Sequence, residues 1–441
     1  MTFGTDEIGD WLEVEDTGIG MSAEVLAGPL VDFGASYWDS ALMLREFPSL
    51  LGRGFQATGR FGIGFFSVFM VAARVRVTTR RHDAAQADTR VLEFRRGLEG
   101  RPLLRIAAET ERMNDGGTQV RIWMNDSPSK LVKPLLRFWE SYSPRVLSAE
   151  VLAGHAPAPL AREEDMFELF CAWLCPALDV HLCVQRRDGT LARVVAASDW
   201  LTLEPRRLVL RTYGLSEPWS EEMRSVLQLA DERMRFVQDD EPIYGRACLP
   251  AHESWLTGGG VVCAITAGGI RIASWPGVVG IMTGVPRTVA RNEARLEADP
   301  SMVGCWATEQ GVLAQDGFAD ESAAASYASQ VAALGGNPKN IPFAQFHGEW
   351  VSCSDIRSWT VVADEYLVVY ASLFDGVNLE GVPVELPDEY DDVFIISATS
   401  RTTYLLWVHR IRGQVLETLS RRRICWLSPS PTCGRLHRNK Y

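Results

Sequence analysis

The sequence predicts an α+β protein in which mixed sheets are backed by helices. Trp11–Glu15 alternates apolar and acidic residues, and Arg74–Arg80 begins with alternating arginine and valine, as half-buried strands do. Between them, Phe65–Ala72 is a continuous apolar run of helix length. Further strand-like segments lie at 91–94, 103–106 and 119–124. We therefore expect a two-layer sandwich in which the 65–72 helix covers one face of a sheet.

Composition limits the class of protein. The chain has 441 residues, of which 46% are hydrophobic and 23% charged, enough for two to four domains of about 100–200 residues each. Lys+Arg number 44 and Asp+Glu 56, so the net charge is −12, which argues against a general nucleic-acid coat. The first ten residues do not resemble a signal peptide, and no apolar run reaches about 18 residues, so we expect no membrane helix and a cytoplasmic location.

Two glycine-rich turns stand out near the start, at Asp16–Met21 and Gly59–Phe65. Glycine lets the backbone adopt positive φ and approach a ligand closely, and N–H groups at the start of a helix face an anion. One Gly-x-Gly alone indicates only a turn. Two such turns, the first led by an aspartate and the second running into an apolar segment, indicate a ligand site.

These two turns together resemble the nucleotide pocket of the GHKL ATPases, which include gyrase-type topoisomerases, sensor histidine kinases and the ninety-kilodalton heat-shock chaperones. Met21, the block Phe61–Ser67 and the segment Val71–Val77 are most similar to the heat-shock protein 90 chaperone branch. The resemblance covers roughly residues 8–125, is patchy over 165–310 and does not extend further. It implies a GHKL (Bergerat-type) two-layer α/β sandwich that binds ATP, followed by an α/β middle domain.

The resemblance also implies roles for individual residues. Asp16 would accept the adenine amino proton, Met21 would cover the base, and Thr118 would bond near both. The turn beneath the base would be formed by Gly18 and Gly20. Backbone N–H groups for the phosphates would come from the second turn, at Gly59, Phe61, Gly62, Ile63, Gly64 and Phe65. The stretch 22–58 would be a lid that closes over the nucleotide.

ATP and Mg²⁺ are the implied cofactors. In the family, a helix before the first motif carries a glutamate that activates water and an asparagine that binds Mg²⁺. Only fifteen residues precede Asp16, and most of them are needed for the strand. The chain as given is therefore expected to lack the general base and the Mg²⁺ ligand, and to hydrolyse ATP very slowly or not at all.

The predicted domains are an ATP-binding domain at 1–126, a linker at 127–164, a chaperone-like middle domain at 165–310 and a C-terminal region at 311–441, expected to be a small α/β domain of unassigned role. Helices are predicted at 130–141, 165–175, 220–236 and, less regularly, 311–336. Strands are predicted at 180–185, 208–212, 261–265, 365–373, 392–398 and 402–408.

One catalytic candidate lies in the predicted middle domain. The segment Gly284–Glu293 resembles a family loop that delivers an arginine to the γ-phosphate, which by position would be Arg291. A guanidinium fork suits phosphate geometry and offsets developing charge. Arg287 is the second choice, and a surface charge at the start of a helix is the alternative for Arg291.

Cysteines offer a possible metal site. Cys171, Cys175, His181 and Cys183 are the densest group of metal-ligand residue types. Alternatively, Cys171 and Cys175 are buried residues one helical turn apart, because free cysteine is commonly buried and no second Cys-x-x-Cys pair is present.

Two functions follow. The first is an ATP-driven conformational switch of the chaperone type, in which nucleotide closes the lid and Arg291 couples the middle domain, with client or partner proteins and a possible homodimer. The second is a nucleotide-sensing binding or signalling module without turnover. ATP-dependent DNA chemistry is disfavoured by the acidic balance. No phosphoacceptor histidine precedes Asp16, which counts against a sensor kinase.

Overall fold

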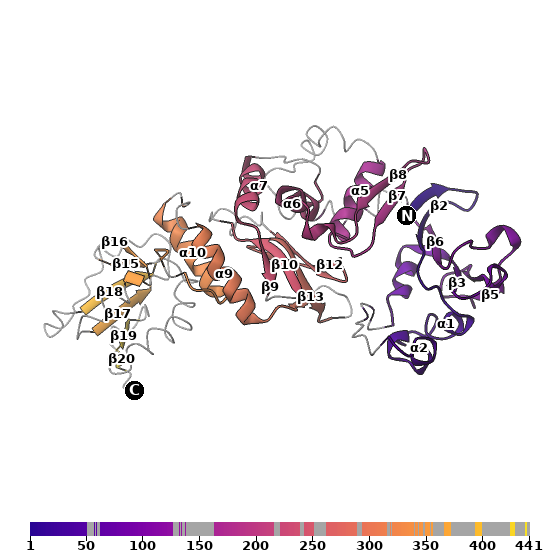
Figure 1. Cartoon of the computed structure of the whole chain (residues 1–441), viewed down its shortest axis with the longest axis horizontal. Helices are drawn as coiled ribbons and strands as arrows, with labels where there is room; N and C mark the ends of the chain where they lie inside the picture. Colours follow the sequence, from indigo (N-terminus) through magenta and orange to yellow (C-terminus); the bar gives the residue numbers. More distant parts are fainter. Residues whose placement is uncertain are drawn as a thin grey trace.

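The computed structural model is elongated, with three sheets following one another along its length (Figure 1). It describes residues 1–50, 62–126, 163–215, 221–238, 242–250, 262–288, 293–314, 320–338, 340–342, 344–346, 349–352, 366–371, 393–398, 424–427 and 437–438, with the isolated residues 57, 59, 132, 134, 137, 318, 354 and 355. The predicted helix at 130–141 and the predicted strand at 402–408 lie outside these ranges, apart from the isolated positions. No helix of the described residues is long and apolar enough to cross a membrane.

An eight-stranded sheet holds the two glycine turns. Its order is β5-β4-β3-β6-β2-β1-β7-β8. The strands are β1 (Thr2–Thr5), β2 (Asp10–Asp16), β3 (Ala72–Arg80), β4 (Arg90–Phe94), β5 (Leu103–Ile106), β6 (Gly117–Met124), β7 (Leu182–Gln185) and β8 (Leu191–Val195). This confirms the strands predicted from residue alternation, and β3 pairs with both β4 and β6. β7 and β8, from beyond the predicted linker, join the sheet through one parallel pair, Thr2 with Gln185.

The prediction of an α-helix over Phe65–Ala72 is wrong. Residues Phe65–Met70 form a 3₁₀ helix, η3, and Ala72 already belongs to β3. The aromatic rings explain the tighter turn. Phe65 and Phe69 both pack on Phe94 of β4, and their ring centroids lie 5.6 and 5.1 Å, respectively, from the Phe94 centroid. Aromatic and β-branched residues favour helices weakly, so this packing decides the local geometry.

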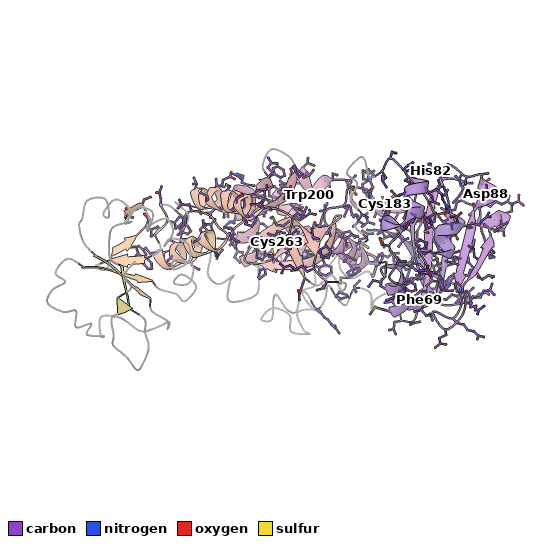
Figure 2. All side chains as sticks on the ribbon, turned by 90° about the horizontal axis from the view of Figure 1, so that it is seen from below. Phe69, His82, Asp88, Cys183, Trp200 and Cys263 are labelled. Atoms are coloured by element: carbon purple, nitrogen blue, oxygen red, sulfur yellow. The ribbon has the colours of Figure 1, made fainter. Side chains whose placement is uncertain are left out.

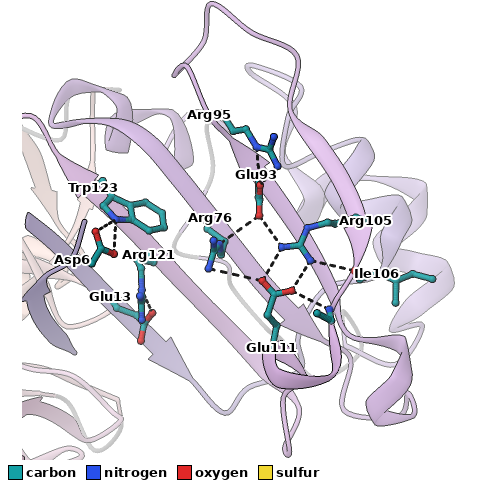
Figure 3. A network of polar contacts seen from close by, with 11 residues as sticks. Asp6, Glu13, Arg76, Glu93, Arg95, Arg105, Ile106, Glu111, Arg121 and Trp123 are labelled. Atoms are coloured by element: carbon teal, nitrogen blue, oxygen red, sulfur yellow. Dashed lines mark hydrogen bonds and ion pairs between the residues drawn. The ribbon is translucent and has the colours of Figure 1, made fainter. Parts of the chain in front are cut away.

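The opposite face of this sheet carries a ladder of charges. Valines 75 and 77 of β3 are in the core, so Arg76 between them lies on the other face. Across the strands Glu13, Arg121, Arg76 and Glu93 follow one another in register. Arg105 bonds both Glu93 (2.8 Å) and Glu111 (2.6 Å), as Figure 3 shows. Each arginine of the ladder is paired with a carboxylate on its other side, Arg121 with Glu13 and Arg76 with Glu93, and such opposite-charge pairs stabilise a sheet face without apolar cover and offset the like charges of Arg121 and Arg76.

Short helices connect β2 with β3. They are α1 (Ala23–Ala27), η1 (Tyr37–Asp39) and α2 (Ala41–Glu46). Ser22 caps α1 by accepting from the Val25 N–H at 3.1 Å, and Ser40 caps α2 by accepting from the Met43 N–H at 3.2 Å. Leu26 and Met43 are buried, so this segment is packed against the protein rather than extended from it.

A second sheet has the order β12-β11-β13-β10-β9, with β14 beside β13. Its strands are β9 (Arg235–Gln238), β10 (Ile243–Cys248), β11 (Val262–Ala267), β12 (Ile270–Pro276), β13 (Val279–Pro286) and β14 (Ala294–Leu296). The helices around it are α5 (Glu163–Leu174), α6 (Pro205–Tyr213), α7 (Glu221–Arg233), α9 (Pro300–Ala314) and α10 (Glu321–Ala333). Trp200 and Cys263 mark this region in Figure 2.

The strand predicted at 208–212 is also wrong, because these residues belong to helix α6. Pro205 stands at its first turn, where a missing N–H is harmless, and Gly214 ends it with φ of 67°. Leu208, Val209, Thr212 and Tyr213 are buried, which is a helical spacing rather than an alternation. The helix predicted at 220–236 is observed as α7, which ends at Arg233, and β9 begins at Arg235.

A third sheet lies at the other end of the molecule, in the order β16-β15-β18-β17-β19-β20 (Figure 1). Its strands are β15 (Ala344–Phe346), β16 (Glu349–Val351), β17 (Tyr366–Ala371), β18 (Val393–Ala398), β19 (Ile424–Leu427) and β20 (His437–Arg438). Strands β17 and β18 confirm the predictions at 365–373 and 392–398, and they pair in parallel. The chain is thus α+β in outline; the predicted domain bounds stay a prediction.

Candidate functional site

The first glycine turn begins where β2 ends, at Asp16. Register places Asp16 opposite Thr118 of β6. The Gly18 N–H donates to Asp16 Oδ1 at 2.8 Å, so the carboxylate orders its own turn and keeps its other oxygen available. Asp16 is exposed in this structure and reaches the cavity described below.

Thr79 of β3 holds the base of this turn together. Its side chain is fully buried. Its hydroxyl donates to Gly117 O at 2.8 Å, accepts from the Met21 N–H at 2.9 Å and lies 3.0 Å from Thr118 Oγ1. One hydroxyl therefore connects the first turn, β3 and the start of β6, which fixes Thr118 beside Asp16.

Two glycines in this region have no room for a side chain. Gly20 has φ of 65°, and a Cβ there would overlap the carbonyl oxygen of Arg80. Gly117 has φ of 132°, and a Cβ there would overlap the carbonyl oxygen of Asp16. Both positions need glycine for conformation and for close backbone approach.

The second turn packs against the segment that follows α1. Gly62 has φ of 63°, and a Cβ there would overlap the backbone of Ala35. The Gly34 N–H donates to Gly62 O at 3.2 Å. Gly64 has nothing within 4 Å of a Cβ position, so its backbone is open on one side. Ser67 Oγ donates to Gly64 O at 2.7 Å and steadies the start of η3.

Both turns line one cavity of about 1130 Å³. Of the residues predicted to bind nucleotide, it brings together Asp16, Gly18, Gly20, Met21, Gly59, Gly62, Ile63, Gly64, Phe65 and Thr118. Phe61 and Arg291 lie outside the described residues. Apolar side chains, including Val25, Leu30 and Met70, complete the lining, as in small-molecule sites with a few convergent polar groups.

One further side of the cavity, here called the far wall, is formed by Ser36, Tyr37, Trp38 and Glu46. These residues lie within the predicted lid, 22–58, but sequence reasoning assigned none of them an individual role. Tyr37 donates its hydroxyl proton to Glu46 Oε2 at 2.7 Å, and Arg81 Nη1 lies 3.2 Å from the same oxygen. Burial and then the bond to Glu46 raise the pKa of Tyr37, so its hydroxyl stays a donor. The adjacent aromatic residues Tyr37 and Trp38 are the local sequence feature that could have indicated this wall.

Arg80, the last residue of β3, and Arg81, which follows it, are both held by contacts within the protein. Arg80 donates to the carbonyl oxygens of Asp115 (3.3 Å) and Asn114 (2.9 Å). Arg81 forks onto Asp83 through two contacts of 2.8 Å and lies over the Phe47 ring at 5.4 Å. Arg80 thus ties the end of β3 to the turn before β6, and Arg81 ties the loop after β3 to the segment containing α2.

The cysteine group does not form a metal centre in the described structure, where no three metal-binding side chains gather. Cys171 is buried, and burial raises its pKa to about 12, so it is a thiol rather than a metal-binding thiolate. Burial likewise raises the pKa of Cys175 to about 11.

Magnesium has few candidate ligands in the described lining of the cavity. Only Asp16 and Glu46 carry carboxylates there, and each already uses an oxygen within the protein. The described hydroxyls near the second turn belong to Ser36 and Ser67, and Ser67 is bonded to Gly64. These residues do not make the carboxylate-plus-phosphate site that Mg²⁺ usually occupies, so we derive no metal-dependent step.

Comparison with known proteins returned no matching family model. A chaperone protein HtpG of Mesorhizobium japonicum is 29% identical over 180 residues, covering 38% of this chain and 26% of that protein. A chaperone protein HtpG of Azorhizobium caulinodans is 40% identical over 89 residues, 20% of this chain and 13% of that protein. The mitochondrial heat shock protein 75 kDa of Bos taurus is 36% identical over 94 residues, 21% and 13% of the two chains. The matched parts thus span about a quarter or less of these relatives.

Proposed function

We propose that this chain, which is similar to the heat-shock protein 90 family, binds ATP in the cavity between its two glycine turns. In this proposal the first domain is of the GHKL type. Asp16 and Thr118 read the adenine edge, and Gly18, Gly20 and Met21 form the floor and cover of the base. Backbone N–H groups from Gly59 to Phe65 hold the phosphates.

The observation that carries the proposal is the convergence of both turns on one cavity. Ionised aspartate only accepts hydrogen bonds, which suits an amino group at one end. The open backbone at Gly64 suits a phosphate at the other end, because N–H groups at the start of a helical segment favour anions. The cavity is large enough for a nucleotide, since ligand sites commonly measure roughly 300–1000 Å³.

The biological role we propose is a chaperone-type conformational switch. Nucleotide would close residues 22–58 over the cavity and couple this movement to the residues beyond 165, with client or partner proteins and a possible homodimer. Arg291, with Arg287 as second choice, would supply the contact to the γ-phosphate. The similarity to chaperones over part of their length supports this role.

A nucleotide-sensing module without turnover is the second candidate. It is favoured by the carboxylates of the described lining: Glu46 ion-pairs with Arg81, which adjoins Gly20, and Asp16 is in the base-side turn. Neither is placed to activate water beside the phosphate-side turn, as a general base must be. Steady-state release of phosphate at the rate of a chaperone ATPase would exclude this second candidate.

Isothermal titration with ATP and ADP tests the binding proposal directly. We expect Asp16→Asn to weaken binding about 10- to 100-fold, because the amide presents a donor toward the adenine amino group. Asp88→Asn is the matched control, since Asp88 is exposed on η4 (Gln86–Asp88) and does not line the cavity. Undetectable binding by the unaltered chain, or equal binding by Asp16→Asn, would overturn the proposal.

A further inference from the structure

The far wall of the cavity reaches both glycine turns. At one end, the Ala35 backbone lies against Gly62 of the second turn. At the other end, Glu46 pairs with Arg81, whose Cα would lie 3.0 Å from a Cβ on Gly20 of the first turn. Residues 35–46 therefore cross the cavity from the proposed phosphate side to the proposed base side.

Glu46 is held on this wall as an oriented carboxylate. Its side chain is 11% exposed. Oε2 takes both the Tyr37 hydroxyl and the Arg81 guanidinium, at 2.7 and 3.2 Å. Arg81 is in turn fixed by its fork onto Asp83. In the described structure Oε1 makes no hydrogen bond, and the residue lines the cavity.

The chemistry of this group limits what it can bind. A carboxylate accepts hydrogen bonds and repels phosphate, so its ligand must offer hydroxyl or amino donors. In the proposed pose Asp16 takes the adenine amino group, and the phosphates lie at the second turn. The remaining donors on a nucleotide are the ribose hydroxyls, and they lie between base and phosphates, where the far wall crosses. An acidic residue that accepts from ribose hydroxyls is a known device in dinucleotide sites.

We propose that Glu46 recognises the ribose of the bound nucleotide, with Tyr37 and Arg81 as positioning residues, and that the cavity therefore selects ribonucleotides over deoxyribonucleotides. This inference rests on the proposed binding of ATP. Its direct consequence is a preference that neither Asp16 nor the glycine turns can produce, because they contact the two ends of the nucleotide and not the sugar.

Titration calorimetry on the full chain with ATP, 2′-deoxyATP and 3′-deoxyATP tests it. We expect at least one deoxy compound to bind about tenfold or more weakly than ATP, since a hydrogen bond to a charged group is lost. Glu46→Gln should weaken ATP and bring the ratio of dissociation constants close to one. Tyr37→Phe, which removes the positioning hydroxyl, should lower the ratio partly.

Glu24→Gln is the matched control, because Glu24 is an exposed carboxylate of the same segment and does not line the cavity. It should leave the ratio unchanged. Equal binding of all three nucleotides by the unaltered chain would overturn the inference while leaving ATP binding intact. An unchanged ratio in a folded Glu46→Gln would do the same. If Glu46→Gln does not fold, the ratios of dissociation constants measured for the unaltered chain and for Tyr37→Phe still test the inference. Failure of the unaltered chain to bind ATP at all would instead remove the proposed function and this inference with it.

Discussion

The two walls of the cavity are built by different means. The wall at the first glycine turn is made of strand ends and glycines, with the buried Thr79 hydroxyl joining three segments. The far wall is a stretch of short helices held by side-chain contacts, chiefly Tyr37 and Arg81 on Glu46. Main-chain pairing in a sheet is hard to break locally, whereas a few side-chain bonds can open with little change elsewhere. In the proposed function, this difference would suit a rigid wall that binds the base and a far wall that moves when nucleotide binds.

The most severe way to disturb the rigid wall is Gly20→Ala. An alanine there would have to adopt the native φ of 65°, which is strained for a residue with a Cβ, and that Cβ would overlap the Arg80 carbonyl. We expect a loss of more than about 3 kcal/mol in local stability, measured by hydrogen exchange of the β2, β3 and β6 amides. Gly64→Ala is the control, with φ of −56° and open space, and should change stability by less than about 1 kcal/mol. Equal effects would mean that the first turn is not conformationally constrained.

Thr79→Val should give the next largest effect on the same wall. It keeps the shape but leaves the Met21 N–H without its acceptor and removes the bond to Gly117. A loss of roughly 2 kcal/mol is expected by hydrogen exchange, together with weaker ATP binding as Thr118 loses its neighbour. Thr78→Val is the control, because Thr78 directly precedes Thr79 in β3 and is also buried. The argument fails if the two valine variants behave alike.

The charged face of the same sheet predicts a dependence on pH. Arg105 lowers the pKa of Glu111 to about 2, from an ordinary value of 4.5. Since the folded-state pKa is the lower one, this pair stabilises the fold fully above about pH 4.5 and loses that effect as pH falls toward 2. Arg105→Gln should therefore lower the stability of β4 and β5 by roughly 1–2 kcal/mol at pH 6 and by less at pH 3, where part of the effect is already lost. Hydrogen exchange at the two pH values measures it; a difference that grows in acid contradicts it.

The smallest effects should separate the contacts that hold the far wall. Tyr37→Phe removes a partly buried bond to Glu46 and should cost about 1 kcal/mol in the local stability of η1 and α2. Glu24→Gln removes an ion pair with Arg45 whose side chains are 65% and 64% exposed, and should stay within about 0.5 kcal/mol. Limited proteolysis within residues 22–50 compares the two. A larger effect from Glu24→Gln than from Tyr37→Phe would mean that the exposed ion pair, and not the Tyr37–Glu46 hydrogen bond, mainly holds this wall.

Prediction from the sequence worked best where a local rule was sufficient. In β3, Val75 and Val77 are buried while Arg74 and Arg76 are not, which is the period-two alternation that a sheet with one covered face requires. It failed where the same residues suit two structures. Leu208–Thr212 contains β-branched and apolar residues compatible with a strand, but the proline before it and the glycine after it frame a helix. The run from Phe65 is helical in composition, yet packing of its rings on Phe94 tightens it to 3₁₀.

By itself, the sequence determined the two glycine turns, the strands beside them and the aspartate that leads the first turn, because positive φ and strand alternation are properties of neighbouring residues. The resemblance also predicted that the two turns share a pocket, but only the tertiary structure showed that Glu46 lines it and what holds Glu46 there. The reason is physical: Glu46 and Arg81 are 35 residues apart in the chain, and no local pattern reports which distant charges a fold brings together. The charge ladder from Glu13 through Arg121 to Glu93 arises from sheet register in the same way.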